Sequence, residues 1–249
     1  MYEHLIILAS SYTLGKRIAW HYSAKKIDKT VTENLIKQTK AILKQPMYAL
    51  HRFPTNSDSW ESVVQKDSYF ADLEVYDSLE KFLNDVKKDQ TITALDIAKA
   101  LLSMQNMTNL KLQKMVYLVY ADYLSKTHKP LFAEKIFAYQ YGPVIKEVYD
   151  EYKIYGQDSI EQMDDSELID SSQITRPIIF ARFSKTEDRT GILESIQDTI
   201  EKFGDKTASQ LVTITHREGS PWSRTWKQRG KNQIIEDETI LKYHDIELI

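Results

Sequence analysis

The stretch from Asn109 to Gly156 decides the fold of this chain. It reads NLKLQKMVYLVYADYLSKTHKPLFAEKIFAYQYGPVIKEVYDEYKIYG. In its first part, apolar side chains recur at helical spacing and cover most of the circumference. This pattern predicts a helix that is buried on most sides. Only a narrow strip is polar, and it runs through Lys111, Lys114, Asp122 and Ser125.

Gln113 falls on the apolar side of this predicted helix. A buried amide must find hydrogen-bond partners. We therefore expect Gln113 to form a hydrogen bond with another element.

The second half of the stretch contains a short apolar run, residues 136–139, followed by Tyr141-Gly142-Pro143. Proline suits the first turn of a helix, where its missing N–H costs nothing, and Gly156 suits the position after a helix end. The spacing between them predicts an amphipathic helix. Its apolar face would hold Val144, Ile145, Val148, Tyr149, Tyr152 and Tyr155.

The composition is that of an ordinary soluble protein of 249 residues. The absence of cysteine excludes disulfides, thiolate metal sites and cysteine nucleophiles. Glycine (7) and proline (6) are scarce, which favours helix over a fold with many turns. The apolar run Leu5–Ala9 is too short for a signal peptide or a membrane span, so we expect a cytoplasmic protein without membrane contact.

The net charge is −3, which disfavours a general affinity for nucleic acid. Locally, however, charge is segregated. Two segments are basic: residues 16–44 contain eight bases and two acids, and residues 217–231 contain five bases and one acid. Two others are acidic: residues 58–89 contain nine acids and four bases, and residues 157–170 contain six acids and no base. These blocks are either solvated faces that complement one another or docking sites for a charged partner.

In the N-terminal part, helical spacing predicts a helix over Leu5–Tyr22, and a capping box opens a second helix at Thr30. Residues 51–59 have loop composition, and the alternation in residues 71–75 is compatible with a short strand. The polar run 87–90 is the best candidate for a domain boundary.

Capping residues and apolar spacing predict five further helices. They start near Thr93, Asp188, Thr207, Ser220 and Asp237. Residues 158–170 are expected to be a loop, and residues 172–183 to be irregular or extended around Pro177. The fold class predicted is therefore mainly α with minor β. A small α or α+β region, residues 1–90, would precede a multi-helix domain, residues 91–249.

The order of several short motifs resembles the Panacea domain of SocA-like and GepA-like antitoxins, over roughly residues 92–246. The resemblance is carried by Leu112-Gln113-Lys114, Pro130-Leu131-Phe132, Tyr141-Gly142-Pro143-Val144, Val148-Tyr149, Tyr155-Gly156, Leu211, Thr215-His216 and Pro221-Trp222. We expect structural roles for Leu112, Gln113, Lys114, Phe132, Gly142, Pro143, Gly156, Thr215 and His216. His216 is expected to be a core histidine with its hydrogen bonds satisfied.

The resemblance implies an antitoxin of a type II-like toxin–antitoxin system, carried by a prophage or mobile element. It would neutralise a co-encoded protein toxin by direct binding, and the region 1–90 would help to choose the toxin. An alternative is an adaptor that delivers a bound partner to a cytoplasmic AAA+ protease. Homo-oligomerisation is left open.

The aromatic residues Tyr141, Tyr149, Tyr152, Trp222 and Trp226 are the candidates for partner contact, because tyrosine and tryptophan are enriched at interfaces. The sequence does not separate core from interface for these residues. Trp222 and Trp226 also interleave with the basic block 217–231. A further alternative is therefore a nucleic-acid-binding regulator, unless the acidic residues 236–238 neutralise this block.

No motif indicates an enzyme, so no catalytic residue and no cofactor are predicted. GxSxG, Walker and GxGxxG patterns are absent. Of the six histidines, only His244 has a possible second ligand at helical spacing, Glu247, and this pair lies at a C-terminus that we expect to fray. No metal site is predicted.

Overall fold

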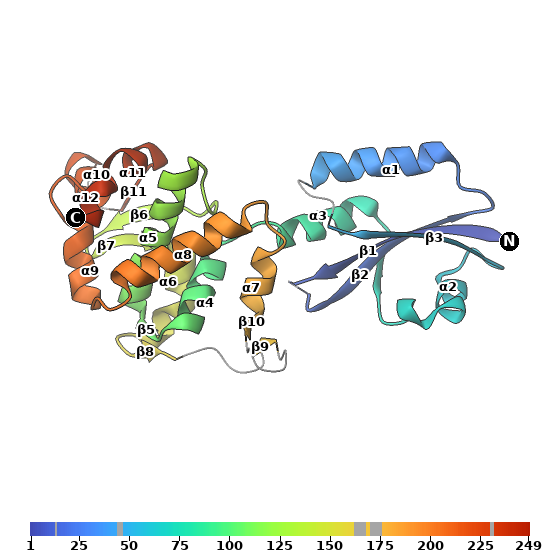
Figure 1. Cartoon of the computed structure of the whole chain (residues 1–249), viewed down its shortest axis with the longest axis horizontal. Helices are drawn as coiled ribbons and strands as arrows, with labels where there is room; N and C mark the ends of the chain where they lie inside the picture. The colour runs from blue at the N-terminus through green and yellow to red at the C-terminus, as the bar shows by residue number, and fades with distance from the viewer. Residues whose placement is uncertain (13, 44–46, 162–167, 170–175, 230–231) are drawn as a thin grey trace. The chain divides into compact units, whose positions relative to one another are not determined.

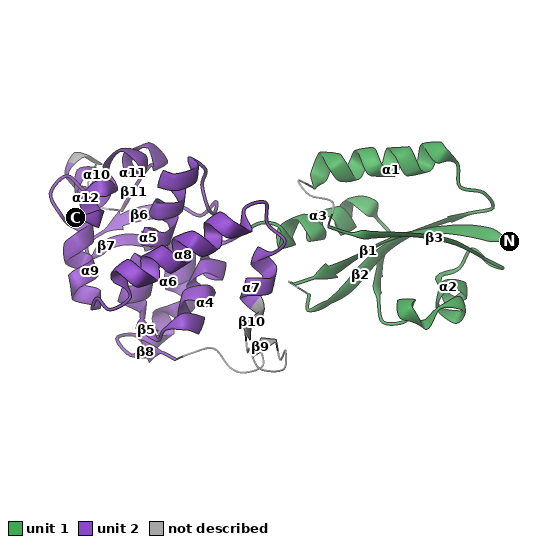
Figure 2. Ribbon diagram, in the orientation of Figure 1, with its two compact units in different colours: residues 1–91 green, residues 92–249 purple. Residues whose placement is uncertain are grey.

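A computed structural model describes residues 1–12, 14–43, 47–161, 168–169, 176–229 and 232–249. The chain forms two compact units, Met1–Thr91 and Ile92–Ile249 (Figure 2). The sequence placed the boundary between residues 90 and 91.

The prediction of a mainly α fold is wrong. The structure is 54% helix and 19% strand and contains several sheets, so the fold is mixed α/β. Most of the difference comes from unit 1, where strands occupy segments expected to be helix or loop.

Unit 1 is built on a four-stranded sheet of order β3-β1-β2-β4 (Figure 1). The central strand β1 (Tyr2–Ser11) pairs antiparallel with β2 (Lys16–Ala24) and β3 (Ala49–Thr55). The short edge strand β4 (Glu74–Tyr76) runs parallel to β2.

The helix predicted over residues 5–22 is a β-hairpin, because the sheet is covered on both faces. Leu5 and Ile7 pack in a cluster with side chains of α1 (Lys29–Ile42) and α3 (Leu79–Asp89). Ile6 packs in a second cluster with side chains of α2 (Trp60–Lys66) and the 3₁₀ turn η1 (Ser68–Phe70). A strand buried on both faces has a continuous apolar run instead of alternation, so periodicity does not distinguish it from a helix. Gly15, with φ +63°, lies in the hairpin turn.

Two other N-terminal predictions are also wrong. Residues 51–55 are strand, and Pro54 is tolerated there because β3 is at the sheet edge. Helix α1 begins at Lys29 after Asp28, without a side-chain cap, so the capping box expected at Thr30 does not form. Of the strand considered at residues 71–75, only Glu74 and Val75 are in β4.

Unit 2 is organised around the long helix α5 (Asn109–Thr127) (Figure 1). The helices with the largest contacts to it are α4 (Ala94–Met104), α8 (Arg189–Phe203), α9 (Ala208–Thr215) and α11 (Asp237–Tyr243). The caps predicted at Asp188 and Thr207 are confirmed, and α10 (Pro221–Arg229) begins at the predicted proline. Thr93, predicted as a helix start, is the cap residue of α4. The cap residue of α11 is Glu236, one position before the prediction.

The helix predicted to begin at Pro143 begins three residues later. Residues Gly142–Ile145 form strand β7, which pairs with β6 (Ile136–Tyr139) in a small sheet completed by β11 (Gln233–Ile234). Helix α6 (Lys146–Tyr152) follows, and the 3₁₀ turn η2 (Lys153–Tyr155) ends at Gly156, with φ +56°.

The remaining elements of unit 2 are short. They are β5 (Met107–Thr108), β8 (Ser159–Ile160), β9 (Leu168–Ile169), β10 (Arg176–Pro177), α7 (Ile178–Phe183) and α12 (Asp245–Leu248). The irregular structure predicted for 172–183 is wrong for α7. Of that segment and the acidic segment 158–170, residues 162–167 and 170–175 lie outside the described residues. In the described part of the chain, no helix has the length and apolarity needed to cross a membrane.

Candidate functional site

Lys114 lies on the central helix α5 with no exposed surface. Its Nζ atom donates a hydrogen bond to the carbonyl oxygen of Pro143 over 2.8 Å. Burial lowers the pKa of the Lys114 ammonium to about 7, because the charged form loses its hydration. The residue assigned to the polar strip of this helix is therefore part of the core, and it holds β7 against α5.

Gly142 lies directly against this lysine. Its φ of +103° is a conformation that favours glycine. A Cβ atom at this position would lie 2.7 Å from Cε of Lys114 and 3.0 Å from Oγ1 of Thr215, which itself donates to the carbonyl of Leu211. Glycine is thus required at position 142 for two reasons. It allows the positive φ, and it lets β7 lie close to both α5 and α9.

Gln113 forms the hydrogen bond predicted for it. Its Oε1 atom accepts from the backbone N–H of Ile145 over 2.9 Å, and its Nε2 atom lies 3.4 Å from Oδ1 of Asn109. Two further motif residues, Leu112 and Phe132, are buried in the core. The motif side chains from residues 112–145 therefore join α5 to β7.

An aromatic stack continues this cluster at the C-terminal side of α9. The rings of His216 and Trp222 are parallel, with centroids 3.6 Å apart, and Trp226 stacks on Trp222 at 5.2 Å. The indole Nε1 of Trp222 donates to the carbonyl of Tyr139 over 2.8 Å. Burial, together with the charge of Lys114, lowers the pKa of His216. Its Nε2 atom is buried without a hydrogen-bond partner among the described residues, so the expectation of a satisfied histidine is wrong.

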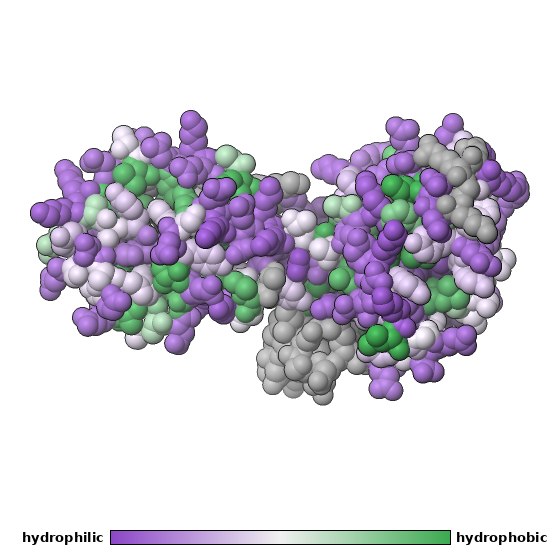
Figure 3. Space-filling view, turned by 180° about the vertical axis from the view of Figure 1, so that it is seen from behind, coloured by the Kyte–Doolittle hydropathy of each residue, from purple (hydrophilic) through white to green (hydrophobic). Residues whose placement is uncertain are grey.

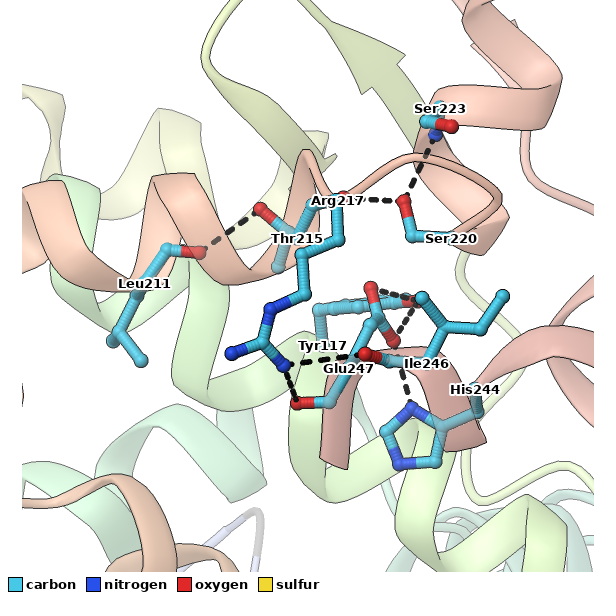
Figure 4. A network of polar contacts seen from close by, with 9 residues as sticks. All are labelled: Tyr117, Leu211, Thr215, Arg217, Ser220, Ser223, His244, Ile246 and Glu247. Atoms are coloured by element: carbon cyan, nitrogen blue, oxygen red, sulfur yellow. Dashed lines mark hydrogen bonds and ion pairs between the residues drawn. The ribbon is translucent and has the colours of Figure 1, made fainter. Parts of the chain in front are cut away.

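A second polar network joins α5 to the C-terminus (Figure 4). The hydroxyl of Tyr117 donates to both carboxylate oxygens of Glu247, at 2.9 and 3.1 Å, and Nδ1 of His244 lies 2.7 Å from the same carboxylate. Arg217 donates to the carbonyl oxygens of Ile246 and Glu247. Burial raises the pKa of the Glu247 carboxyl.

The expectation of a fraying C-terminus is therefore wrong, because His244 and Glu247 are only 2% and 1% exposed. The pair forms a direct hydrogen bond. Across the described ranges, no group of three histidine or acidic side chains is placed to hold a metal ion.

The five aromatic candidates for partner contact divide into two sets. Tyr141 and Tyr149 are 62% and 47% exposed, whereas Tyr152 and Trp222 are 8% and 7% exposed. Trp226 is half-buried. Of the five, Tyr141 and Tyr149 are exposed, and the others belong largely to the core.

Sequence reasoning missed one exposed apolar residue near these tyrosines in the chain. Ile154 in η2 is 80% exposed, and Tyr155, which was placed on a buried face, is 40% exposed. The sequence contains one signal for this exposure, which is the short distance between Pro143 and Gly156. A segment this short cannot place all of its apolar side chains on one buried face. Figure 3 shows hydrophobic residues in separate patches on the visible face of unit 2.

The basic block 217–231 is used mainly within unit 2. Besides the Arg217 contacts, Arg224 donates to the carbonyl of Gly219 and lies over the ring of Tyr243, and Lys227 pairs with Glu218. Residues 230–231 lie outside the described residues. These contacts favour a structural role for the block over the nucleic-acid surface considered from the sequence.

Residues 112–223 match the family described as antitoxin SocA-like, Panacea domain. The match lies within unit 2 and contains all nine motif residues expected to be structural, but it is narrower than the resemblance noted from the sequence. Comparison with curated proteins and with solved structures gave no match.

Proposed function

We propose that this chain, whose residues 112–223 match the SocA-like Panacea domain, acts as an antitoxin that neutralises a protein toxin by direct binding. The toxin is a co-encoded protein of a type II-like system. Neutralisation consists of occupying the surface through which the toxin acts.

One structural observation supports this proposal in addition to the family match. Tyr141 is exposed on a turn that the core of unit 2 holds in place. This tyrosine lies in the turn between β6 and β7, directly before Gly142, and is exposed while the three residues after it are buried. The bond from Lys114 to Pro143 and the bond from Gln113 to Ile145 fix β7 directly after the turn. A rigid, exposed tyrosine loses little conformational entropy on binding, which is why such residues dominate many interfaces.

Helix α6 and η2 extend the exposed apolar surface along the chain. Tyr149, Ile154 and Tyr155 are all at least 40% exposed, and α6 is packed on α4 and α5. Exposed aromatic and aliphatic groups on a supported element are typical of protein-binding surfaces.

Co-expression tests this proposal. The neighbouring reading frame is induced alone and together with this chain, and growth and complex formation are measured. We expect a small gene that is lethal alone and harmless with this chain, and a stable complex on gel filtration. A double variant, Tyr149→Ala with Ile154→Ala, should lose protection, whereas Leu241→Ala, at a 39% exposed position on α11, should retain it. Protection without any complex would contradict direct binding.

The amount of toxin in the same cells separates sequestration from delivery to a AAA+ protease. Neutralisation by occupancy predicts that the toxin stays at its normal level while toxicity is blocked. A toxin level that falls when this chain is present would instead support the adaptor role.

We assign partner choice in part to unit 1, which has its own sheet and two apolar clusters and lies outside the matched residues. A pull-down with and without residues 1–91 checks this assignment. Equal recovery of the same toxin by both forms would remove it.

A further inference from the structure

Unit 1 carries opposite charges on the two faces of its β-sheet. Helices α1 and α3 cover the face that contains Leu5 and Ile7, whereas α2 and η1 cover the face that contains Ile6 (Figure 1). Residues 25–42 and 79–88, which include α1 and most of α3, contain eight lysines and four acids and are called the basic layer below. Residues 58–72, which include α2 and η1, contain four acids and one lysine. The sheet therefore separates a basic helical layer from an acidic one.

Most lysines of the basic layer are not neutralised within unit 1. Five of them are exposed and form no ion pair with any residue that the structure describes, and these are Lys25, Lys37, Lys40, Lys81 and Lys87. Lys29 pairs with Glu33 over 3.3 Å, but both side chains are exposed, so this pair is weak. The sequence left open whether the charged blocks complement one another or dock a partner. Because the two layers lie on opposite faces of the sheet, the geometry favours a docking surface.

Helix α1 presents its lysines as a straight row. Of its 14 residues, only Leu35 and Thr39 are buried. Lys29, Lys37 and Lys40 are exposed, and helical geometry places them within about 80° around the axis and over about 17 Å along it. This length corresponds to about five successive phosphates of one strand of a duplex.

We propose that the basic layer binds the phosphate backbone of a double-stranded nucleic acid. All bases of the layer are lysines, and none is arginine. Lysine is depleted at protein–protein interfaces, where arginine and aromatic residues are enriched, but it binds phosphate well as a point charge. The charge and the residue type together therefore fit a phosphate backbone better than an acidic protein.

Two other anionic partners fit less well. Helices α1 and α3 are both fully described, and neither has an exposed aromatic residue on which the bases of a single strand could stack. The apolar side of α1 packs toward the sheet, so it is not available for insertion into a lipid surface. Nucleic-acid binding is a further activity, and it does not depend on the proposed binding of a toxin.

The test uses the full-length chain and a fluorescein-labelled DNA duplex of arbitrary sequence, with fluorescence anisotropy as the measurement. We expect binding at about 50 mM salt that weakens steeply as salt rises to about 200 mM, because each phosphate contact releases a counterion. Lys37→Glu combined with Lys40→Glu should weaken binding about tenfold or more. It should also reduce the slope of log K against log salt by about two.

A matched double variant controls for general electrostatics. Lys129→Glu combined with Lys135→Glu makes the same change in net charge at two exposed positions of unit 2, and should bind the duplex like the unchanged chain. All four substituted positions are exposed, so both variants should fold, which circular dichroism checks.

Several results would overturn the inference. They are no binding at about 50 mM salt, binding that does not depend on salt, and equal loss of binding in both double variants. Competition by a poly-glutamate peptide as effective as that by unlabelled duplex would instead assign the layer to acidic proteins. Preference for phosphatidylglycerol vesicles over the duplex would assign it to a membrane surface. Because no toxin is present, this result and the co-expression result can fail independently of each other.

Discussion

The Nζ atom of Lys114 lies 2.8 Å from the carbonyl oxygen of Pro143, and the lysine has no exposed surface. Within the described part of the chain, no carboxylate forms an ion pair with this ammonium. Burying an unpaired charge costs folding free energy, so part of the stability of unit 2 depends on the protonation state of one lysine.

The first prediction concerns pH and Lys114. Its folded-state pKa, about 7, is below the ordinary lysine value of 10.5, so between these pH values the unfolded chain binds more protons. The free energy of unfolding should therefore rise with pH above about 7, by at most about 1.4 kcal/mol per pH unit from this group. Urea unfolding at pH 7, 8 and 9 checks this. Lys114→Met should reduce the slope, and an unchanged slope would contradict the pKa shift.

The second prediction concerns Gly142. Gly142→Ala forces a Cβ atom against Cε of Lys114 and keeps a positive φ, so it should lower the free energy of unfolding by about 2 kcal/mol or more. Gly156→Ala is the matched control, because φ is also positive there but a Cβ would meet nothing within 4 Å. If the two variants are equally stable in urea, the close approach of Lys114 is not what requires glycine.

The third prediction concerns the C-terminal network. Glu247→Ala leaves the buried Tyr117 hydroxyl and His244 Nδ1 without the carboxylate, and should cost about 3 kcal/mol. Amides of residues 244–249 should also exchange hydrogen faster. Asp245→Ala, at an exposed neighbouring position, should change stability by less than about 0.5 kcal/mol. Slow exchange in Glu247→Ala would show that apolar contacts alone hold this segment.

The fourth prediction concerns acid sensitivity of unit 1. Nδ1 of His4 and Nε2 of His21 are 2.7 Å apart, and Nε2 of His4 lies 2.9 Å from the Ser57 carbonyl oxygen, to which it can only donate. Nδ1 of His4 is then the acceptor, and His21 donates to it. Burial, and to a lesser extent the charge of His4, lowers the pKa of His21 to about 4, below the ordinary histidine value of 6.5.

A histidine with a depressed folded-state pKa contributes stability that is complete above about 6.5 and is lost as pH falls toward 4. Unit 1 should therefore unfold at lower urea concentration at pH 5 than at pH 7, as reported by its amide signals. His21→Gln should weaken this dependence, and His128→Gln, at an exposed position, should not. Protonation of His21 above pH 6 in the folded protein would contradict the prediction.

Much of unit 2 was predictable because its signals are local. The caps at Thr93, Asp188 and Thr207 form hydrogen bonds with backbone groups three residues away, so a short window of sequence contains both partners. Gln113 was also predictable, since an amide on an apolar helix face requires a partner.

The hairpin of unit 1 was not predictable in this way. Leu5 and Ile6 point to opposite faces of β1, and each face is covered by helices that come much later in the chain. The resulting continuous apolar run also fits the spacing of a buried helix, which is why a helix was predicted there.

The sequence alone determined the central helix, the order of motifs that resembles the Panacea domain, and most helix starts in unit 2. Only the tertiary structure decided which polar groups are buried and which aromatic residues stay exposed. Lys114 is buried because Gly142 lets β7 approach it, and Glu247 is buried beside Tyr117, 130 residues away in the chain. Burial is set by such contacts between distant segments, and local periodicity carries no information about them.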